Sequence, residues 1–174
     1  MEPLILAALA SAAVAAVAVR ARRRSSRPDR ASRRSHSRAS YPGDFDGRVD
    51  VAYSPRLDGR PDPGEVVWTW VPYEEDHSRG KDRPVLLIGR DGRWLLALQL
   101  TSKDHDLDAA QEGRWGRRWM DIGTGAWDSR RRPSEVRLDR IVRVDPSAVR
   151  REGAVLDRRR FDAVARSLSE LHHW

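Results

Sequence analysis

The sequence predicts a mainly β domain with one α-helix, in which a small twisted or barrel-like sheet is followed by a C-terminal helix. Three observations predict this fold. All seven tryptophans lie beyond Pro63, short apolar runs there alternate with Gly, Asp and Pro, and the last apolar pattern has helical spacing. The 112 residues from 63 to 174 are enough for one compact domain.

The first strand is predicted over residues 64–73 (GEVVWTWVPY), where β-branched and aromatic residues are bounded by glycine and proline. A polar loop, 74–82, follows it. Two further apolar runs, 84–89 and 93–101, flank a glycine-containing turn, and together they predict a β-hairpin.

The hairpin turn can close in two ways. A two-residue turn, Asp91-Gly92, pairs Arg90 with Arg93, whereas a three-residue turn pairs Gly89 with Arg93. A slip of one residue exchanges the two faces of a strand, and the three-residue turn separates polar from apolar side chains more cleanly. We therefore predict the three-residue turn.

In that register Arg83 lies opposite Gln99 and has Thr101 as a diagonal neighbour about 7–8 Å away. An arginine side chain can span that gap, and a phosphate could be held between the guanidinium and the hydroxyl group. The alternative is that Arg83 only makes the end of the strand more soluble and that Thr101 only ends its own strand.

The remaining elements follow in order. A turn is predicted at 121–128, with flanking strands around Trp119 and Trp127, and alternation over 134–145 predicts a strand with a bend at Asp139. A C-terminal amphipathic helix is predicted by the apolar residues at positions 161, 164, 165, 168 and 171.

Residues 1–20 are predicted to form a hydrophobic N-terminal helix. The apolar run 4–19 would be about 24 Å long, short of the roughly 30 Å hydrocarbon core, and Arg20 could extend it by snorkelling. Arginines follow this run, which predicts a single-pass anchor with the rest of the chain on the cytoplasmic side of the inner membrane, and membrane contact through residues 4–24. The alternative is a soluble, alanine-rich helix and a cytoplasmic protein.

Residues 21–62 are rich in Arg, Ser, Asp, Gly and Pro, and this composition predicts a basic, disordered linker. Nine arginines and one aspartate between 20 and 38 give a local charge of +8, which leaves −1 for the rest of a chain whose total is +7. The basic balance therefore belongs to the tail and does not predict a basic globular face.

The chain has no cysteine, which excludes disulfides and thiolate zinc sites. The acids and histidine in 103–108 (KDHDLD) have no second ligand cluster elsewhere in the sequence, so we expect a solvated loop there. Glycine-rich phosphate loops and dinucleotide fingerprints are also missing, and neither a metal nor a cofactor is expected.

Five segments in a fixed order, "GEVVW", a polar loop, "RPVLLIG", "LQLTS" and "SEVRLDRIVRVD", resemble the MazF/PemK-type toxin family of type II toxin–antitoxin systems. The resemblance covers most of residues 64–171. It implies that residues 63–174 form an SH3-like barrel with a C-terminal helix, which assembles as a homodimer. It also implies a metal-independent endoribonuclease acting on single-stranded RNA such as mRNA, and a peptide antitoxin that covers the RNA groove.

Carried over position by position, the resemblance implies that Arg83 is the catalytic arginine and that Thr101 is the hydroxyl residue after the next strand. His77, six positions before Arg83, matches a loop histidine of some members, and Arg137 and Asp139 match an Arg-x-Asp pair of the same members. With their neighbours, these positions give four candidate RNA-binding residues: Arg137, Ser102, Gln99 and Arg79.

The sequence departs from the family pattern in two places. Ser78-Arg79 replace an acid and a glutamine that are common after the histidine, and Arg140 replaces a glutamine after the strand aspartate. These departures predict altered sequence specificity or weaker cleavage.

The implied chemistry is attack of the RNA's own 2′-hydroxyl on the adjacent phosphate, which requires no metal. Arg83 would stabilise the added negative charge, Thr101 would position the phosphate or the 2′-hydroxyl, Asp139 would be the base, and His77 would be an acid or electrostatic helper. The alternatives are an exposed loop imidazole for His77 and a structural ion pair for Arg137 and Asp139.

Aromatic side chains could stack on bases, and the candidates beside arginines are Trp115, Trp119 and Trp127. The alternative is that the tryptophans belong to the core or to a dimer interface. A different class of function also fits the sequence: a non-catalytic RNA- or peptide-binding module with the same barrel, tethered to the membrane.

Overall fold

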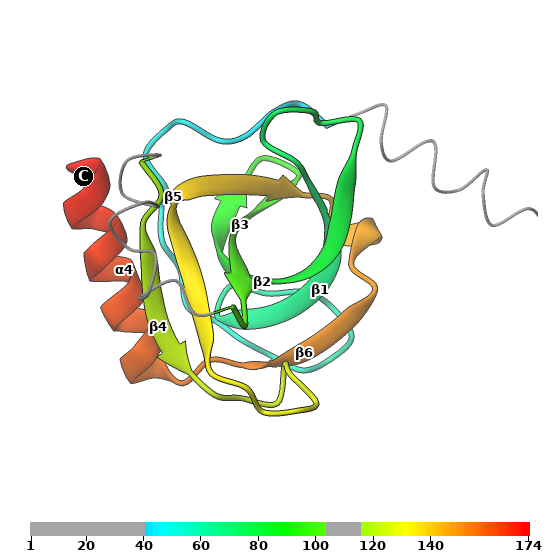
Figure 1. The fold of residues 1–174 in the computed structure, drawn as a ribbon, viewed down its shortest axis with the longest axis vertical. Coiled ribbons are helices and arrows are strands. Elements are labelled where there is room, and N and C mark those ends of the chain that lie inside the picture. The colour runs from blue at the N-terminus through cyan, green and yellow to red at the C-terminus, as the bar shows by residue number, and fades with distance from the viewer. Residues whose placement is uncertain (1–40, 104–115) are drawn as a thin grey trace, which may run out of the picture. The chain divides into compact units, whose positions relative to one another are not determined.

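A computed structural model describes residues 41–103 and 116–174. Six strands form one antiparallel sheet in the order β4-β5-β3-β2-β1-β6. The sheet curls into a half-barrel, and the C-terminal helix α4 packs on its β4–β5 side (Figure 1). The elements are β1 (Glu65–Pro72), β2 (Gly80–Asp91), β3 (Trp94–Thr101), β4 (Trp119–Gly123), β5 (Ser134–Val144), β6 (Arg151–Val155) and α4 (Arg158–His172).

These elements confirm the mainly β prediction and the C-terminal helix. One strand prediction was wrong, and one strand was missed. Trp127 lies in a buried turn rather than in a strand, and β6, which pairs with β1, was not predicted. Within the described residues, no helix is long and apolar enough to cross a membrane. The predicted helix at 1–20 lies outside the described residues.

Both faces of the sheet bury apolar side chains, because the half-barrel curls around one face and α4 covers the other. The larger cluster includes Leu86 and Leu98 from the sheet and Phe161 and Leu168 from α4. The opposite face carries a smaller cluster: Val67, Val71, Val85, Leu87, Leu95, Ala97, Val142 and Val144. The central strands are therefore apolar on both faces, as expected for strands buried on both sides.

The hairpin of β2 and β3 has the predicted faces but not the predicted turn. Asp91 pairs with Trp94 across a two-residue turn in which Gly92 takes a φ of 56°. A bulge between Leu87 and Gly89 then shifts the register by one residue. The bulge restores the alternation that the three-residue turn would have produced, so the apolar side chains lie on the faces that the sequence predicts.

Residues 41–53, which we call the strap, pack on the outside of the domain, so the linker predicted to extend to residue 62 is wrong for this part of the chain. Figure 1 shows the strap running from the β1–β2 loop toward α4. The Phe45 N–H donates to the Ile141 carbonyl (2.8 Å), and Val49 is only 4% exposed. Tyr53 donates to the Leu156 carbonyl (2.9 Å) and contacts the Phe161 ring. The composition of this segment did not predict the packing, because its few large side chains lie among many polar residues.

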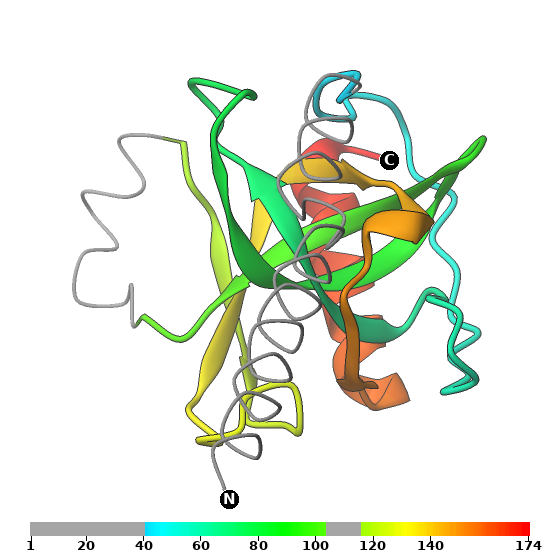
Figure 2. The same cartoon turned by 90° about the vertical axis from the view of Figure 1, so that its right-hand side faces the viewer.

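Figure 2 shows the β1–β2 loop and the turn of the β2–β3 hairpin at opposite ends of the domain. The loop end is therefore the open end of the hairpin, where β2 begins and β3 stops. Side chains from the β1–β2 loop can meet those of the two strand ends there.

The contact between the strap and β2 predicts the effect of Gly89→Ala. A Cβ atom at residue 89 would lie 2.8 Å from the Asp50 carbonyl oxygen and 2.9 Å from Val49 Cγ1. We expect the variant to lose about 1–3 kcal/mol of unfolding free energy, measured by urea denaturation of the full chain, because the strap must move away. Unchanged or increased stability would show that the strap is not held at this position.

Candidate functional site

A groove of about 280 Å³ opens where β1 ends, β2 begins and β3 ends, alongside β4 and β5. Its lining includes four of the side chains that the sequence selected: Arg83, Gln99, Thr101 and Arg137. The lining also includes Tyr73, Glu74, Lys103, Arg117, Trp119 and Arg140. Five of the thirteen lining residues are cations, two are acids and two are aromatic.

The hairpin register brings Arg83 and Thr101 to the same place. The structure pairs Gln99 with Val85, so the predicted pairing of Gln99 with Arg83 was wrong by two residues. Continuing the observed register by two residues places Thr101 opposite Arg83, rather than diagonal to it. Gln99 stays on the same face and also lines the groove.

Arg83 is half-buried, and within the described residues its side chain makes no ion pair or hydrogen bond. A buried polar group is normally bonded, so a cation held in this way is a candidate anion site. The Thr101 hydroxyl oxygen accepts a hydrogen bond from the Lys103 N–H (3.1 Å), which leaves its hydroxyl proton to donate. The two groups together can hold a phosphate oxygen.

Arg137 and Asp139 form a bidentate pair on β5. Arg137 Nε lies 3.1 Å and 3.0 Å from the two Asp139 carboxylate oxygens, and Nη2 lies 2.6 Å from Oδ2. Arg137 Nη1 also lies 3.0 Å from Glu74 Oε2. Burial alone would lower the pKa of Arg137, but its bonds with the two carboxylates outweigh burial and raise the pKa above its ordinary value.

Asp139 does not line the groove. Its Oδ1 also accepts a hydrogen bond from the Arg118 N–H (2.7 Å), so both carboxylate oxygens are occupied by donors. This bonding fixes the bend predicted at Asp139, where the β3–β5 register jumps between Leu98 and Leu100. The geometry therefore favours a structural ion pair between Asp139 and Arg137 over a role of Asp139 as the base.

The remaining predicted residues, His77, Ser102 and Arg79, do not line the groove. The His77 ring packs edge-on against Tyr41 with centroids 5.0 Å apart, and Ser102 is exposed beside Thr101. The Arg79 carbonyl accepts from the Tyr73 N–H (2.8 Å), and its guanidinium lies 5.8 Å from the Tyr73 ring centre. Arg79 therefore closes the base of the β1–β2 loop.

The β1–β2 loop is held by its own aspartate. Asp76 Oδ1 accepts hydrogen bonds from the backbone N–H (2.9 Å) and the hydroxyl (2.6 Å) of Ser78. These bonds lower the pKa of Asp76 below its ordinary value. Ser78, which departs from the family pattern, thus stabilises the turn that carries His77.

Arg140, the second departure, is buried and joins three segments. Its Nε and Nη2 bond the Asp44 carboxylate (2.7 Å and 3.1 Å), and its Nη1 donates to the Pro72 carbonyl (2.9 Å). Tyr41 also donates to Asp44. This cluster could not be predicted from the sequence, because an aspartate in a segment rich in Arg and Ser is typical of a solvated linker.

This cluster shifts two pKa values. Burial alone would raise the pKa of Asp44, but its bonds with Arg140 and Tyr41 outweigh burial and lower the pKa below its ordinary value. Burial and the bond to Asp44 raise the pKa of Tyr41 well above its ordinary value. Asp44 is therefore ionised, and Tyr41 is protonated, at neutral pH.

Two of the three tryptophans proposed to stack on bases lie in the described residues, and of these two Trp119 fits that role. It lines the groove and is half-buried. Trp127 is 2% exposed, and its indole N–H donates to the Ser134 hydroxyl (3.1 Å), so it belongs to the core. Trp115 and the predicted acidic loop at 104–108 lie outside the described residues.

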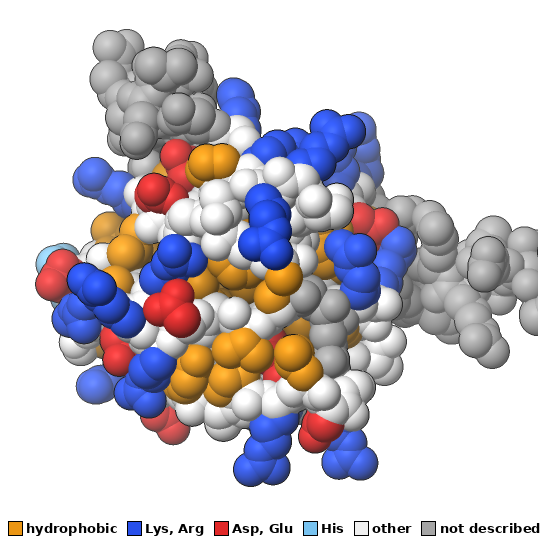
Figure 3. All heavy atoms as spheres, turned by 90° about the horizontal axis from the view of Figure 1, so that it is seen from below, with side chains coloured by type: hydrophobic (Ala, Val, Ile, Leu, Met, Phe, Trp, Pro, Cys, Tyr) orange, Lys and Arg blue, Asp and Glu red, His pale blue; other side chains and the backbone are white. Residues whose placement is uncertain are grey.

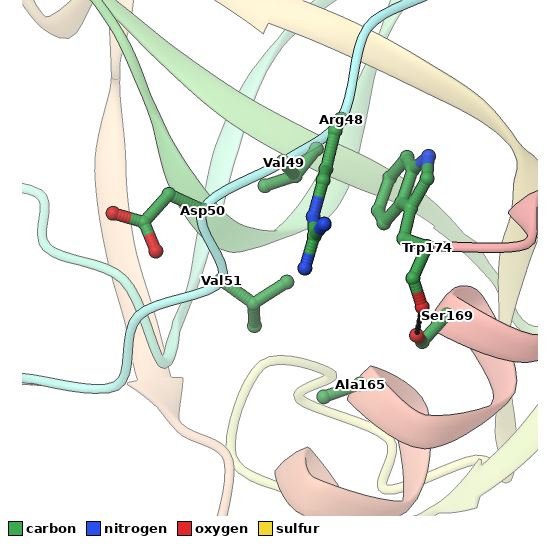
Figure 4. A pocket seen from close by; sticks show the side chains of 7 residues that line it. All are labelled: Arg48, Val49, Asp50, Val51, Ala165, Ser169 and Trp174. Atoms are coloured by element: carbon green, nitrogen blue, oxygen red, sulfur yellow. Dashed lines mark hydrogen bonds between the residues drawn. The ribbon is translucent and has the colours of Figure 1, made fainter.

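A second cavity, of about 520 Å³, lies between the strap and α4 and contains none of the predicted site residues. Figure 4 shows the Arg48 side chain extending between Val51 and Trp174, with Ser169 bonded to Trp174. Figure 3 shows one face of the domain, on which cations are interspersed with acids and apolar side chains. No group of three or more metal-ligating side chains occurs in the described part of the chain.

Comparisons with known proteins give a family match. The family described as "PemK-like, MazF-like toxin of type II toxin-antitoxin system" matches residues 62–172. No curated protein matches the chain.

Two solved structures are among those to which the chain is similar. MazE-MazF (Form-II) from Deinococcus radiodurans is 18% identical, with a TM-score of 0.45 over 64% of this chain and 94% of that chain. The Mycobacterium tuberculosis toxin MazF-mt6 is 16% identical, with a TM-score of 0.42 over 63% of this chain and 96% of that chain.

The lowered pKa of Asp44 predicts how pH affects the contribution of the strap. A carboxyl group whose pKa is depressed in the folded state stabilises the fold above its unfolded pKa, and this contribution is lost as the pH falls through the folded pKa. We expect Asp44→Asn to lower the unfolding free energy by about 1–2 kcal/mol at neutral pH. The difference from wild type should begin to shrink as the pH falls below about 4, where an unfolded aspartate takes up its proton, and should keep shrinking through the lower folded pKa of Asp44.

Urea denaturation of the full-length wild type and variant across this pH range measures the difference. A gap that stays constant from neutral to acid pH would show that the Asp44 charge contributes nothing to stability.

Proposed function

The chain belongs to the PemK-like, MazF-like family of toxins of type II toxin–antitoxin systems, and on that premise we propose that it is an endoribonuclease that cleaves single-stranded RNA. Toxins of this family are generally endoribonucleases. The family match covers all the strands that line the groove, which supports placing the reaction there.

One observation carries the proposal: Arg83, without a side-chain partner in the described residues, lies across the hairpin from the Thr101 hydroxyl. A guanidinium stays protonated at all relevant pH values, and its donor geometry matches two phosphate oxygens. Since the hydroxyl can donate a further hydrogen bond, the site offers donors to a phosphate from both strands of the hairpin.

The reaction that these donors favour is attack of the 2′-hydroxyl on the adjacent phosphate. The attack places extra negative charge on the non-bridging oxygens, and fixed donors aimed at those oxygens lower the barrier. Arg83 stabilises that charge, and Thr101 orients the phosphate. Because the nucleophile belongs to the RNA itself, the step needs no metal or cofactor.

Side chains around this phosphate bind the rest of the RNA. Gln99 lies beside it on the same face of β3, and Ser102 follows Thr101 at the exposed end of the strand. Trp119 offers a ring face for stacking, which is worth roughly 1–3 kcal/mol per base. Arg79, in the β1–β2 loop, contacts phosphates beyond the groove.

A peptide antitoxin is the proposed regulator. The groove is lined by several cations, so an acidic peptide lying across it would exclude RNA by occupying the same donors. We also propose that the chain works as a homodimer, as the family resemblance implies.

The test incubates the purified full-length protein with a long single-stranded RNA in EDTA. We expect cleavage by the wild type, a loss of about 100-fold or more with Arg83→Ala, and a smaller loss with Thr101→Val, because each variant removes a donor to the phosphate. Arg90→Ala is the matched control, since Arg90 bonds Asp62 at the other end of β2.

Equal cleavage by Arg83→Ala and wild type would place the activity outside this groove. If the wild type binds RNA but leaves it intact, the chain is the non-catalytic binding module that the sequence also allowed.

A further inference from the structure

Glu74 places a carboxylate in the groove at the start of the β1–β2 loop. Glu74 and Glu75 are the acids that line the groove in the part of the chain that the structure describes. Glu74 Oε2 lies 3.0 Å from Arg137 Nη1, and within residues 41–103 and 116–174 the side chain makes no other ion pair or hydrogen bond. The side chain of Glu74 is 52% exposed, so it can both contact a bound RNA and exchange protons with solvent.

Arg137 holds that carboxylate from inside the protein. Its side chain is 7% exposed, and two of its three nitrogens are fixed by Asp139, which is itself 17% exposed. The Arg118 N–H fixes Asp139 in turn. The third nitrogen, Nη1, contacts Glu74. The buried Arg137–Asp139 pair therefore supports the exposed carboxylate of Glu74.

This arrangement separates the roles of the two carboxylates. A general base must bring a lone pair to the proton that it removes. Both oxygens of Asp139 already accept hydrogen bonds, and Asp139 does not line the groove. Glu74 keeps Oε1 without a bond in the described residues and faces the groove. A base oriented by a second group, which a third group holds in place, is a common catalytic arrangement.

Building on the proposed endoribonuclease activity, we propose that Glu74 is the general base of the reaction and that Arg137 and Asp139 are positioning residues. Glu74 takes the proton of the 2′-hydroxyl as the 2′-oxygen forms its bond to phosphorus. The bond from phosphorus to the 5′-oxygen then breaks, and that oxygen takes a proton from water. The products are a 2′,3′-cyclic phosphate and a 5′-hydroxyl. The hydroxide formed removes the proton from Glu74.

The experiment compares Glu74→Gln with Glu75→Gln in the full chain, on a long single-stranded RNA in EDTA. Both variants remove one negative charge from the same loop, but only Glu74 contacts Arg137. We expect kcat to fall about 100-fold or more for Glu74→Gln and less than about threefold for Glu75→Gln. Affinity for a non-cleavable 2′-O-methyl RNA should be unchanged or tighter in both variants.

The pH dependence separates a base from a positioning residue. The wild-type rate should fall on the acidic side of the profile, because a protonated base cannot accept the 2′-hydroxyl proton. The cleavage rate of Glu74→Gln should not show this fall, the acidic limb of the profile. Asp139→Asn should lower kcat but keep the limb, since Glu74 remains present and only its orientation suffers.

Wild-type cleavage rates in Glu74→Gln, or equal losses in the Glu74 and Glu75 variants, would overturn the assignment of the base. If Arg83→Ala abolished cleavage in the same assay, the endoribonuclease would stand while the base assignment failed. Absence of cleavage by the wild type would overturn both.

Discussion

The antiparallel pairing of β2 with β3 is the constraint on which the groove depends. Because side chains alternate along a strand, a shift of one residue would send Arg83 or Thr101 to the opposite face of the sheet. The buried leucines on both strands resist such a shift, since it would move the whole apolar set out of its cluster. Packing in the middle of the hairpin therefore fixes the position of two polar groups at its open end. These polar side chains destabilise the sheet little, because they lie at strand ends, where polar side chains are tolerated.

The strap adds a second constraint from outside the segment that the family match covers. Arg140 is a buried cation, and a buried charge without a partner is strongly destabilising. Asp44 of the strap supplies the carboxylate, and the Pro72 carbonyl takes a further donor at the last residue before the β1–β2 loop. The same guanidinium lines the groove. One side chain thus couples the packing of residues 41–53 to the position of the loop that carries Glu74.

The sequence predicts the parts of this structure that depend on local pattern. Alternation and helical spacing located β1, the hairpin, β5 and α4, and the family resemblance selected Arg83 and Thr101, which the structure brings to one groove. The bulge at Ile88 was not predictable, because its only effect is to compensate for a shorter turn. The Asp44–Arg140 pair joins residues 96 positions apart, and composition places Asp44 in a linker. In the sequence, Glu74 does not differ from the other acids of a polar loop. The structure distinguishes it by its contact with Arg137.

In the groove, donors from two strands hold a phosphate, and a supported carboxylate faces it. This arrangement requires that Arg83 and Thr101 act on the same phosphate. The most direct measurement is a double-mutant cycle, with calorimetric binding of a non-cleavable 2′-O-methyl RNA to the wild type, Arg83→Ala, Thr101→Val and the double variant. If both side chains bind one phosphate, the losses should be non-additive, with a coupling of about 1 kcal/mol. Losses that add to within about 0.3 kcal/mol would show that the two groups act at separate places and would contradict the account.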